Sequence, residues 1–159
     1  METRHITKDD FDRIVEVIDA WWGGPIGTFA HPIFFYELGD HAVVVEDAGT
    51  MIGFLLGFIA TPPSSPASTP STTKIGYVHL VGIHPDYRRR GVGRVLYAKF
   101  IDNCRAAGCR RMKAITTHGN EGSIRFHLAL GFSAGEVEDY AGPGRKRLVF
   151  TKDLTQEVG

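Results

Sequence analysis

The sequence predicts a single domain of the mixed α/β (α+β) class, in which helices cover a central sheet. Three observations carry this prediction: apolar strand-like segments alternate with amphipathic helical segments, no internal repeat is visible, and 43% of the 159 residues are hydrophobic. A chain of this length and composition can bury one core and is short for two. We expect about six to seven strands flanked by about four helices, in the order β-α-α-β-β-β-α-β-α-β-β.

A helix is expected to begin after Thr7, because Asp10 stands at the capping-box position three residues later. The helical period then predicts one buried stripe, formed by Phe11, Ile14, Val15 and Ile18. A loop with the sequence WWGGP, at 21–25, interrupts this pattern. A second short helix is expected at 31–38.

Two apolar segments, at 42–46 and 51–60, flank a short turn that contains Gly49, which is a hairpin signal. The segment TPPSSPASTPSTT, at 61–73, cannot bury a core and lacks ladder donors at its prolines, so it predicts a surface loop within the domain. The remaining elements are expected as a strand at 75–83, a helix that ends near 107, a strand at 112–117, a helix at 123–130 and strands at 137–140 and 147–154.

The charge balance argues against several classes of partner. The 18 basic and 18 acidic residues give a net charge of zero, whereas a nucleic-acid-binding domain usually has a basic excess, so no nucleic-acid partner is expected. The longest apolar run, at 51–60, is half the length of a membrane span, and the N-terminus lacks the apolar core of a signal peptide, so no membrane partner is expected. The two cysteines, Cys104 and Cys109, are interpreted as reduced structural thiols, which indicates a cytoplasmic location.

The segment HPDYRRRGVGR, at 84–94, holds four arginines and two glycines between a predicted strand and a predicted helix. The first turn of a helix carries unpaired N–H groups and the positive end of the helix dipole, and glycines let an anion approach that backbone closely. The segment therefore predicts a cradle for a pyrophosphate; the alternative is a turn that only closes a loop. No Lys-Ser/Thr pair follows Gly93 and no third glycine has the required spacing, which excludes a Walker loop and a dinucleotide fingerprint.

A second segment, NEGSIRFHLALGF at 120–132, follows about one predicted strand later. Together the two segments resemble the two motifs of the GNAT N-acetyltransferase superfamily. The first is RxxGxG between a strand and a helix; the second is Asn, a small residue three places later, and an aromatic pair before Gly-Phe. The matching residues are Arg88, Gly91 and Gly93, then Asn120, Ser123, Phe126, His127, Gly131 and Phe132, with Ser123 in place of the more usual alanine. The resemblance covers essentially the whole chain and implies a single GNAT-like domain over 1–159 with a strongly twisted mixed sheet.

The resemblance implies that acetyl-CoA is the acyl donor and that backbone N–H groups of the turn bind its pyrophosphate. The positions carried over are Arg88, Arg89, Arg90, Gly91, Val92, Gly93 and Arg94. It also implies that the pantetheine arm lies between two neighbouring parallel strands, with Val81 and Ile83 as backbone partners. In this arrangement Gly82 marks a bulge that parts the strands, and Asn120 and Ser123 contact the ligand.

Direct transfer of an acyl group from a thioester to an amine needs a deprotonated amine, a stabilised oxyanion and a proton for the thiolate. His127 stands where the family often has a tyrosine acid, so it is a candidate proton donor; the alternative is a neutral histidine held by backbone. His79, on the strand before the turn, is the candidate base; its alternative is a histidine buried by tertiary contacts. Glu46 and His118 are weaker candidates for the base. No metal is predicted, because no His/Cys/Asp cluster has metal-ligand spacing.

Trp21, Trp22 and Phe34 lie in the region that walls the acceptor site of similar enzymes, and the alternative is that several of them are core residues. The two tryptophans cannot both face inward from a regular helix, so one should be partly exposed. The predicted function is transfer of an acetyl group from acetyl-CoA to a primary amine of a small molecule, within a ternary complex. The alternatives are a protein or peptide N-acetyltransferase and a CoA-binding module without turnover. Homodimers are common among similar proteins, but no feature of this sequence selects an interface.

Overall fold

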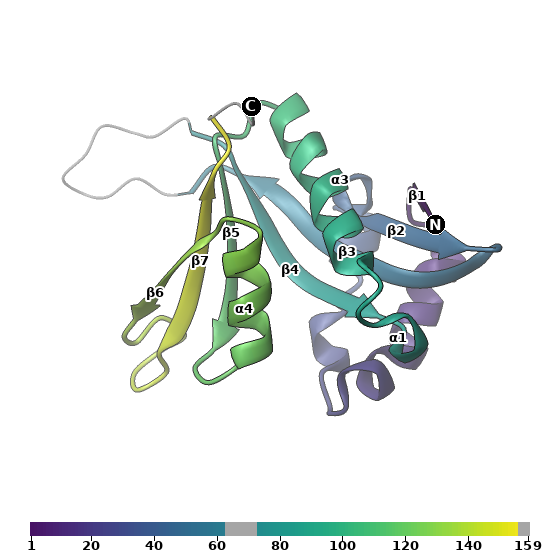
Figure 1. The fold of residues 1–159 in the computed structure, drawn as a ribbon, viewed down its shortest axis with the longest axis horizontal. Helices are drawn as coiled ribbons and strands as arrows, with labels where there is room; N and C mark the ends of the chain where they lie inside the picture. The colour runs from purple at the N-terminus through teal and green to yellow at the C-terminus, as the bar shows by residue number, and fades with distance from the viewer. Residues whose placement is uncertain (63–72, 156–159) are drawn as a thin grey trace. The chain divides into compact units, whose positions relative to one another are not determined.

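The computed structural model describes residues 1–62 and 73–155 (Figure 1). Its seven-stranded mixed sheet has the order β1-β2-β3-β4-β5-β7-β6, which confirms the predicted α/β class. The chain packs as two compact units: Met1–Phe58 with Val78–Asn103, and Ile59–Tyr77 with Cys104–Gly159. The loop expected at 61–73 lies almost entirely outside the described residues, and the single domain over 1–159 stays a prediction. None of the described helices is long and apolar enough to cross a membrane.

The first unit combines three N-terminal strands with the helices that precede and follow them. β1 pairs with β2, and β2 pairs with β3, both antiparallel, with an irregularity in the ladder between Val45 and Glu46. The elements that contribute to this unit are β1 (Glu2–Arg4), α1 (Lys8–Trp22), η1 (Gly27–Phe29), α2 (Ile33–Tyr36), η2 (Gly39–His41), β2 (Val43–Asp47), β3 (Thr50–Ala60), β4 (Ile75–Ile83), η3 (Pro85–Tyr87) and α3 (Val92–Ala106).

The start of α1 has the expected capping box. The Thr7 hydroxyl accepts a hydrogen bond from the Asp10 N–H at 3.2 Å, and the Asp10 carboxylate accepts one from the Thr7 N–H at 2.8 Å. Arg4 donates to both Asp10 and Glu46, so β1, α1 and β2 are joined by one charged cluster. The predicted stripe needs one correction, because Val15 is 50% exposed and the buried apolar positions of α1 are Phe11, Ile14, Val17, Ile18 and Trp21.

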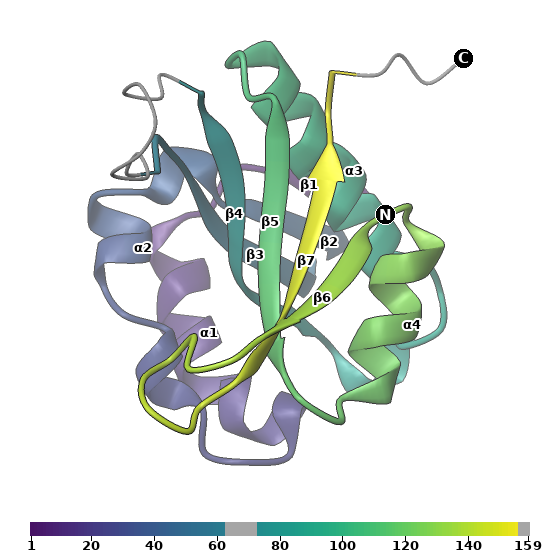
Figure 2. The ribbon, with the colours of Figure 1, turned by 90° about the vertical axis from the view of Figure 1, so that its left-hand side faces the viewer.

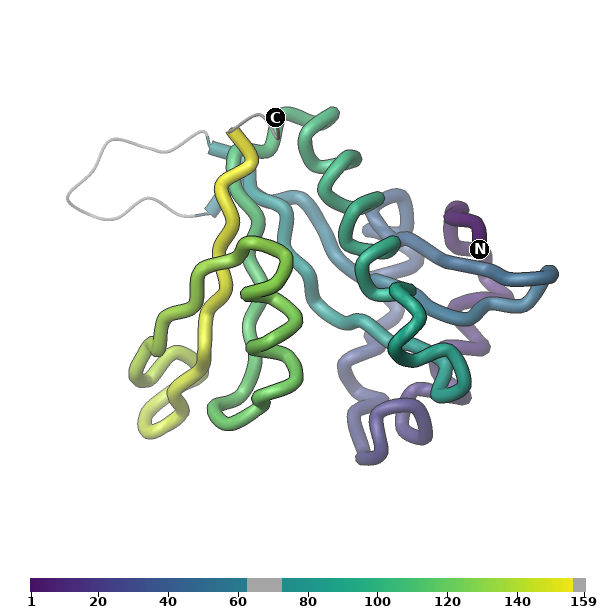
Figure 3. The backbone as a smooth tube through the Cα atoms, viewed as in Figure 1, coloured from purple at the N-terminus to yellow at the C-terminus, as the bar shows by residue number. Residues whose placement is uncertain are grey.

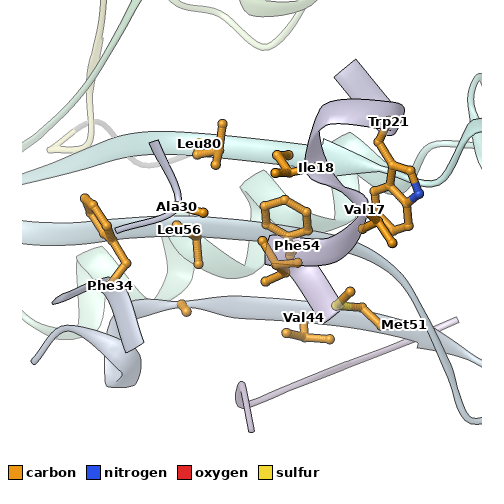
Figure 4. Close-up of a cluster of buried hydrophobic side chains, with 12 residues drawn as sticks. Val17, Ile18, Trp21, Ala30, Phe34, Val44, Met51, Phe54, Leu56 and Leu80 are labelled. Carbon is orange, nitrogen blue, oxygen red and sulfur yellow. The ribbon is translucent and has the colours of Figure 1, made fainter. Parts of the chain in front are cut away.

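The core of this unit lies between α1 and the strands (Figure 4). Trp21 stacks on Phe54 with ring centroids 6.1 Å apart. Two glycines allow close packing in this unit, one beneath Phe54 and one beneath α3. A Cβ added at Gly82 would lie 2.4 Å from the Phe54 ring, and one added at Gly53 would lie 2.6 Å from a methyl group of Val92. Gly82 therefore leaves room for Phe54 within the continuous strand β4, and Gly53 lets the start of α3 sit directly on β3.

The second unit contains β5 (Arg111–Thr117), α4 (Glu121–Ala129), β6 (Ser133–Val137) and β7 (Arg147–Asp153). β7 lies antiparallel between β5 and β6 (Figure 2). The strand expected at 137–140 instead ends at Val137, and all five residues of β6 are exposed. A strand with no buried face has no apolar alternation, so the hydrophobic pattern could not locate it. Cys104 and Cys109 are buried free thiols, and burial raises the pKa of Cys104 to about 12.

Candidate functional site

The turn that joins β4 to α3 (Figure 3) contains two residues with left-handed backbone angles. Arg89 and Gly91 both have left-handed backbone angles, with φ of 61° and 79°. Such alternation turns successive N–H groups toward one concave side. The Val95 N–H donates a hydrogen bond to the Gly91 carbonyl at 3.1 Å, at the start of α3. The N–H groups of the helical residues before Val95 have no acceptor within the helix. No heavy atom lies within 4 Å of a Cβ added at Gly91, so this side of the turn is open.

Two of the four arginines of the 84–94 segment, Arg88 and Arg90, contact other residues of the protein. The Arg88 guanidinium donates to the main-chain carbonyl of Trp21, at the C-terminal end of α1. Arg90 lies over the Tyr87 ring, 5.3 Å from its centroid, and the Tyr87 hydroxyl donates to Asp47 at 3.3 Å. Arg89 and Arg94 are exposed, which leaves their charges near the open side of the turn: Arg89 lies in it and Arg94 in the first turn of α3.

The half-buried face of β4 carries the other predicted donor and base positions. The pattern along β4 alternates, so His79, Val81 and Ile83 share one face. The Val81 carbonyl accepts a hydrogen bond from the Trp22 indole N–H at 2.9 Å. A carbonyl oxygen has two lone pairs, so Val81 can still accept a second hydrogen bond from a ligand.

His79 is fixed by three contacts from the segment between α1 and β2. Its Nε2 lies 2.7 Å from the Phe29 carbonyl oxygen. Its ring stacks on Phe34 at 4.1 Å between centroids and an interplanar angle of 11°, and Phe29 meets it edge-on at 6.1 Å. Burial lowers the pKa of His79, and the bond to Phe29 partly opposes that shift. The imidazole is therefore neutral at neutral pH.

The expected acceptor wall separates into a buried part and an exposed part. Trp21 is 7% exposed and Phe34 6%, so both are core residues, whereas Trp22 is 49% exposed. This agrees with the expectation that one tryptophan of the pair faces outward, and it leaves Trp22 as the ring that an acceptor could reach. The main-chain carbonyl of Phe29 is a site group that the sequence could not indicate, because any residue offers the same carbonyl.

In the second unit, Asn120, Ser123 and His127 form a continuous set along α4. Asn120 caps the helix by accepting a hydrogen bond from the Ser123 N–H at 3.2 Å, and it donates to Thr116 at 3.2 Å. His127 Nδ1 lies 2.8 Å from the Ser123 carbonyl, and the ring stacks on Phe150 at 4.1 Å. Burial lowers the pKa of His127, which reduces its protonated fraction at neutral pH and favours the structural alternative over the proton donor.

Each of the weaker base candidates lies against another ionisable side chain. Glu46 accepts from Arg4 at 2.7 Å, and His118 lies 2.8 Å from the exposed Glu136. Over residues 1–62 and 73–155, no three His, Cys, Asp or Glu side chains gather as metal ligands would.

Comparison with known proteins decides the family. Residues 11–132 match the model of the acetyltransferase (GNAT) family. The chain belongs to the GNAT acetyltransferase family. Both motifs, the turn at 88–94 and the segment at 120–132, fall within the matched residues.

Relatives of this GNAT protein include enzymes from several organisms. It is 26% identical over 143 residues to an uncharacterized N-acetyltransferase of Methanocaldococcus jannaschii, covering 84% of this chain and 61% of the relative. It is 39% identical over 54 residues to the L-amino acid N-acyltransferase MnaT of Escherichia coli, covering 34% of this chain and 31% of that one. The chain thus spans less than two thirds of the length of these relatives. Over 157 residues it is 26% identical to an acetyltransferase of Sodalis glossinidius, covering 94% and 96%.

Solved structures share the fold. Naa20 of Chaetomium thermophilum, in complex with a bisubstrate analogue, superposes with a TM-score of 0.75 at 21% identity, covering 96% of this chain and 86% of that one. The yncA acetyltransferase of Salmonella typhimurium, with its cofactor acetyl-CoA, superposes with a TM-score of 0.70 at 21% identity, covering 99% and 96%. At this identity the likeness concerns the fold alone.

Proposed function

We propose that this GNAT protein is an acetyl-CoA-dependent N-acetyltransferase that acetylates the primary amine of a small molecule in the cytoplasm. The observation that carries the proposal is the turn with left-handed Arg89 and Gly91 in front of α3. Its open side, its backbone N–H groups and the exposed charges of Arg89 and Arg94 fit a pyrophosphate. The fold neighbour of Salmonella typhimurium is bound to acetyl-CoA.

The chain's own residues supply binding and proton transfer. Backbone N–H groups of the turn, from Arg89 to Arg94, would hold the pyrophosphate, and backbone groups of Val81 and Ile83 would hold the extended arm. Acetyl-CoA supplies the thioester. The reaction forms the amide C–N bond and breaks the C–S bond, while one proton leaves the amine nitrogen and one reaches the thiolate.

Relatives with higher local identity favour a small-molecule acceptor. One is named an L-amino acid N-acyltransferase, and another, of Salmonella typhimurium, is named an L-methionine sulfoximine/L-methionine sulfone acetyltransferase and is 40% identical over 55 residues, covering 35% of this chain and 32% of that one. The exposed rings of Trp22 and Phe29 suit an amine with a small apolar substituent. A peptide acceptor is the second candidate, since another fold neighbour, the NatC complex, is bound to Gag peptide and CoA.

A thiol-release assay tests this function. Purified protein is given acetyl-CoA with free L-amino acids, with short peptides that have a free N-terminus, or with no acceptor. Release that depends on amino acids supports the proposal, and release with peptides only supports the second candidate. CoA binding by calorimetry without amine-dependent release would indicate a binding module. The Gly91→Val variant serves as the control that lacks the cradle.

A further inference from the structure

We propose that Nδ1 of His79 is the atom that accepts the proton of the acceptor amine, and that Phe34 and the main-chain carbonyl of Phe29 are positioning groups for it. This inference rests on the proposed acetyl transfer. It goes further by assigning one nitrogen, one tautomer and one buried ring to the proton transfer.

The contact with Phe29 determines the tautomer. A carbonyl oxygen only accepts hydrogen bonds, so at 2.7 Å the Nε2 of His79 must be the donor. In a neutral imidazole the other nitrogen then carries the lone pair. Nδ1 is therefore a proton acceptor whenever His79 is neutral, which its lowered pKa favours.

Nδ1 is also not fully buried. Within the part of the chain that the structure describes, every fully buried side-chain nitrogen or oxygen has a hydrogen-bond partner. No partner for His79 Nδ1 is found among these residues, so this nitrogen is not one of the fully buried atoms. Nε2 is thus held by the Phe29 carbonyl, while Nδ1 keeps a lone pair and some accessible surface, as a general base requires.

Phe34 fixes the plane of the ring. Its ring lies nearly parallel to the imidazole, and it also meets Phe58 at 6.3 Å between centroids within the buried core. A core side chain is held by close packing, so the stacked imidazole can turn only if the core moves. Phe34 is buried and reaches the reaction through His79, which makes it a positioning residue.

β5 follows β4 in the sheet order and carries Arg111 and Lys113, but no charged group is among the causes of the lowered pKa of His79. The sequences of η1 (GTF), α2 (IFFY) and β3 (TMIGFLLGFIA) contain no Asp, Glu, Lys or Arg. Tyr36 on α2 and Tyr77 on β4 are the titratable groups nearby in sequence and strand position, and burial raises the pKa of Tyr77 to about 12. The Tyr77 phenol is therefore uncharged at the pH of the assay.

The first experiment uses ¹⁵N NMR of the full chain, with the imidazole resonances followed over pH. The expected result is a His79 ring protonated at Nε2 and a pKa below the ordinary value of ~6.5. In Phe34→Leu the His79 pKa should move toward the ordinary value and the tautomers should mix. Phe11→Leu is the matched control, since it shortens another buried phenylalanine, and it should leave the His79 resonances unchanged. An Nδ1–H tautomer in the wild type, or equal shifts in both variants, would overturn the inference. This measurement needs no turnover, so it is independent of the proposed function.

The second experiment separates catalysis from binding. His79→Gln keeps a side-chain N–H that can reach the Phe29 carbonyl but has no proton-accepting nitrogen. Its kcat should fall by at least ~100-fold with little change in KM for acetyl-CoA, because a positioned base contributes on the order of a hundredfold or more. Phe34→Leu should lower kcat by about tenfold, with Phe11→Leu near wild type. Suppose that the wild type releases thiol with an amine and that kcat is unchanged in His79→Gln. This result would overturn the inference and leave the proposed function standing. Absence of release in the wild type would overturn the proposed function, and with it the proton-transfer role assigned to Nδ1, while the NMR result would still decide the tautomer and the positioning by Phe34.

Discussion

The Arg88 guanidinium donates a hydrogen bond to the main-chain carbonyl of Trp21, at the end of α1. The side chain of the first residue of the RxxGxG motif is therefore bonded within the protein. The last turn of α1 contains no basic side chain, so Arg88 supplies the positive charge that complements this end of the helix dipole.

We expect Arg88→Ala to destabilise the fold by about 1–2 kcal/mol, because it leaves a terminal carbonyl of α1 without its charged donor. Urea unfolding measures this difference. Arg94→Ala removes an exposed charge from α3 and should stay within about 0.5 kcal/mol of wild type. Equal stabilities for the two variants would show that the contact with Trp21 contributes nothing.

Arg89 occupies a left-handed conformation that costs a non-glycine residue about 1–2 kcal/mol. Arg89→Gly should therefore unfold at a higher temperature than Arg89→Ala, although both lose the same charge. Calorimetric melting of the pair isolates the backbone effect. If the alanine variant were the more stable, the turn would have another conformation.

Gly91→Val should abolish measurable CoA binding, because a β-branched residue at a φ of 79° forces the turn out of the cradle conformation. Arg89→Ala should weaken binding only severalfold, since it removes one exposed charge. Isothermal titration with CoA at two salt concentrations tests both variants. Small and equal losses in affinity would contradict a backbone cradle.

Asp10 gives the fold an acid-sensitive element. Burial opposes ionisation of this carboxyl, but the hydrogen bonds from Arg4 and Thr7 outweigh it, and its pKa lies below the ordinary value. A lowered folded-state pKa stabilises the fold above the unfolded value of about 3.9, and this contribution disappears as the pH falls through the folded value. Asp10→Asn should thus cost about 1–2 kcal/mol at neutral pH. Chemical denaturation at a series of pH values measures the difference in unfolding free energy between this variant and the wild type. The difference should disappear below about pH 4, near the unfolded pKa. A difference that stays constant would exclude this linkage.

His127→Phe should retain most of the turnover of the wild type. The imidazole is neutral, its Nδ1 is directed at the Ser123 carbonyl, and phenylalanine preserves the stack on Phe150. Steady-state kinetics with an amine that the wild type acetylates checks this. A loss of kcat of about a hundredfold or more would instead identify His127 as the proton donor.

Patterns local in sequence predicted much of the fold. The capping box at Thr7, the hairpin around Gly49 and the helix that follows the RxxGxG turn each depend on neighbours within a few residues, and each is present in the structure. Val15 was misplaced because several registers of a short amphipathic helix satisfy the period. The exposed strand β6 escaped detection because it has no buried face.

The site was less predictable than the fold, for a physical reason. His79 and Trp22 could be selected by residue type, but their partners are the main-chain carbonyls of Phe29 and Val81. Every residue has a main-chain carbonyl, so residue type cannot indicate which carbonyl becomes a partner. The contact between Arg88 and Trp21 joins residues that lie 67 positions apart, so it depends on tertiary packing alone.

Because Gly53 has no Cβ, it helps to determine where the proposed donor-binding turn lies above the sheet. The methyl group of Val92 occupies the space that any larger residue at position 53 would need. The height of the first turn of α3 above the sheet is thereby set by a residue on another strand, remote from the turn in sequence. The position of the turn therefore depends on how α3 packs on β3. A Gly53→Ala substitution would displace the turn without changing any residue of the motif.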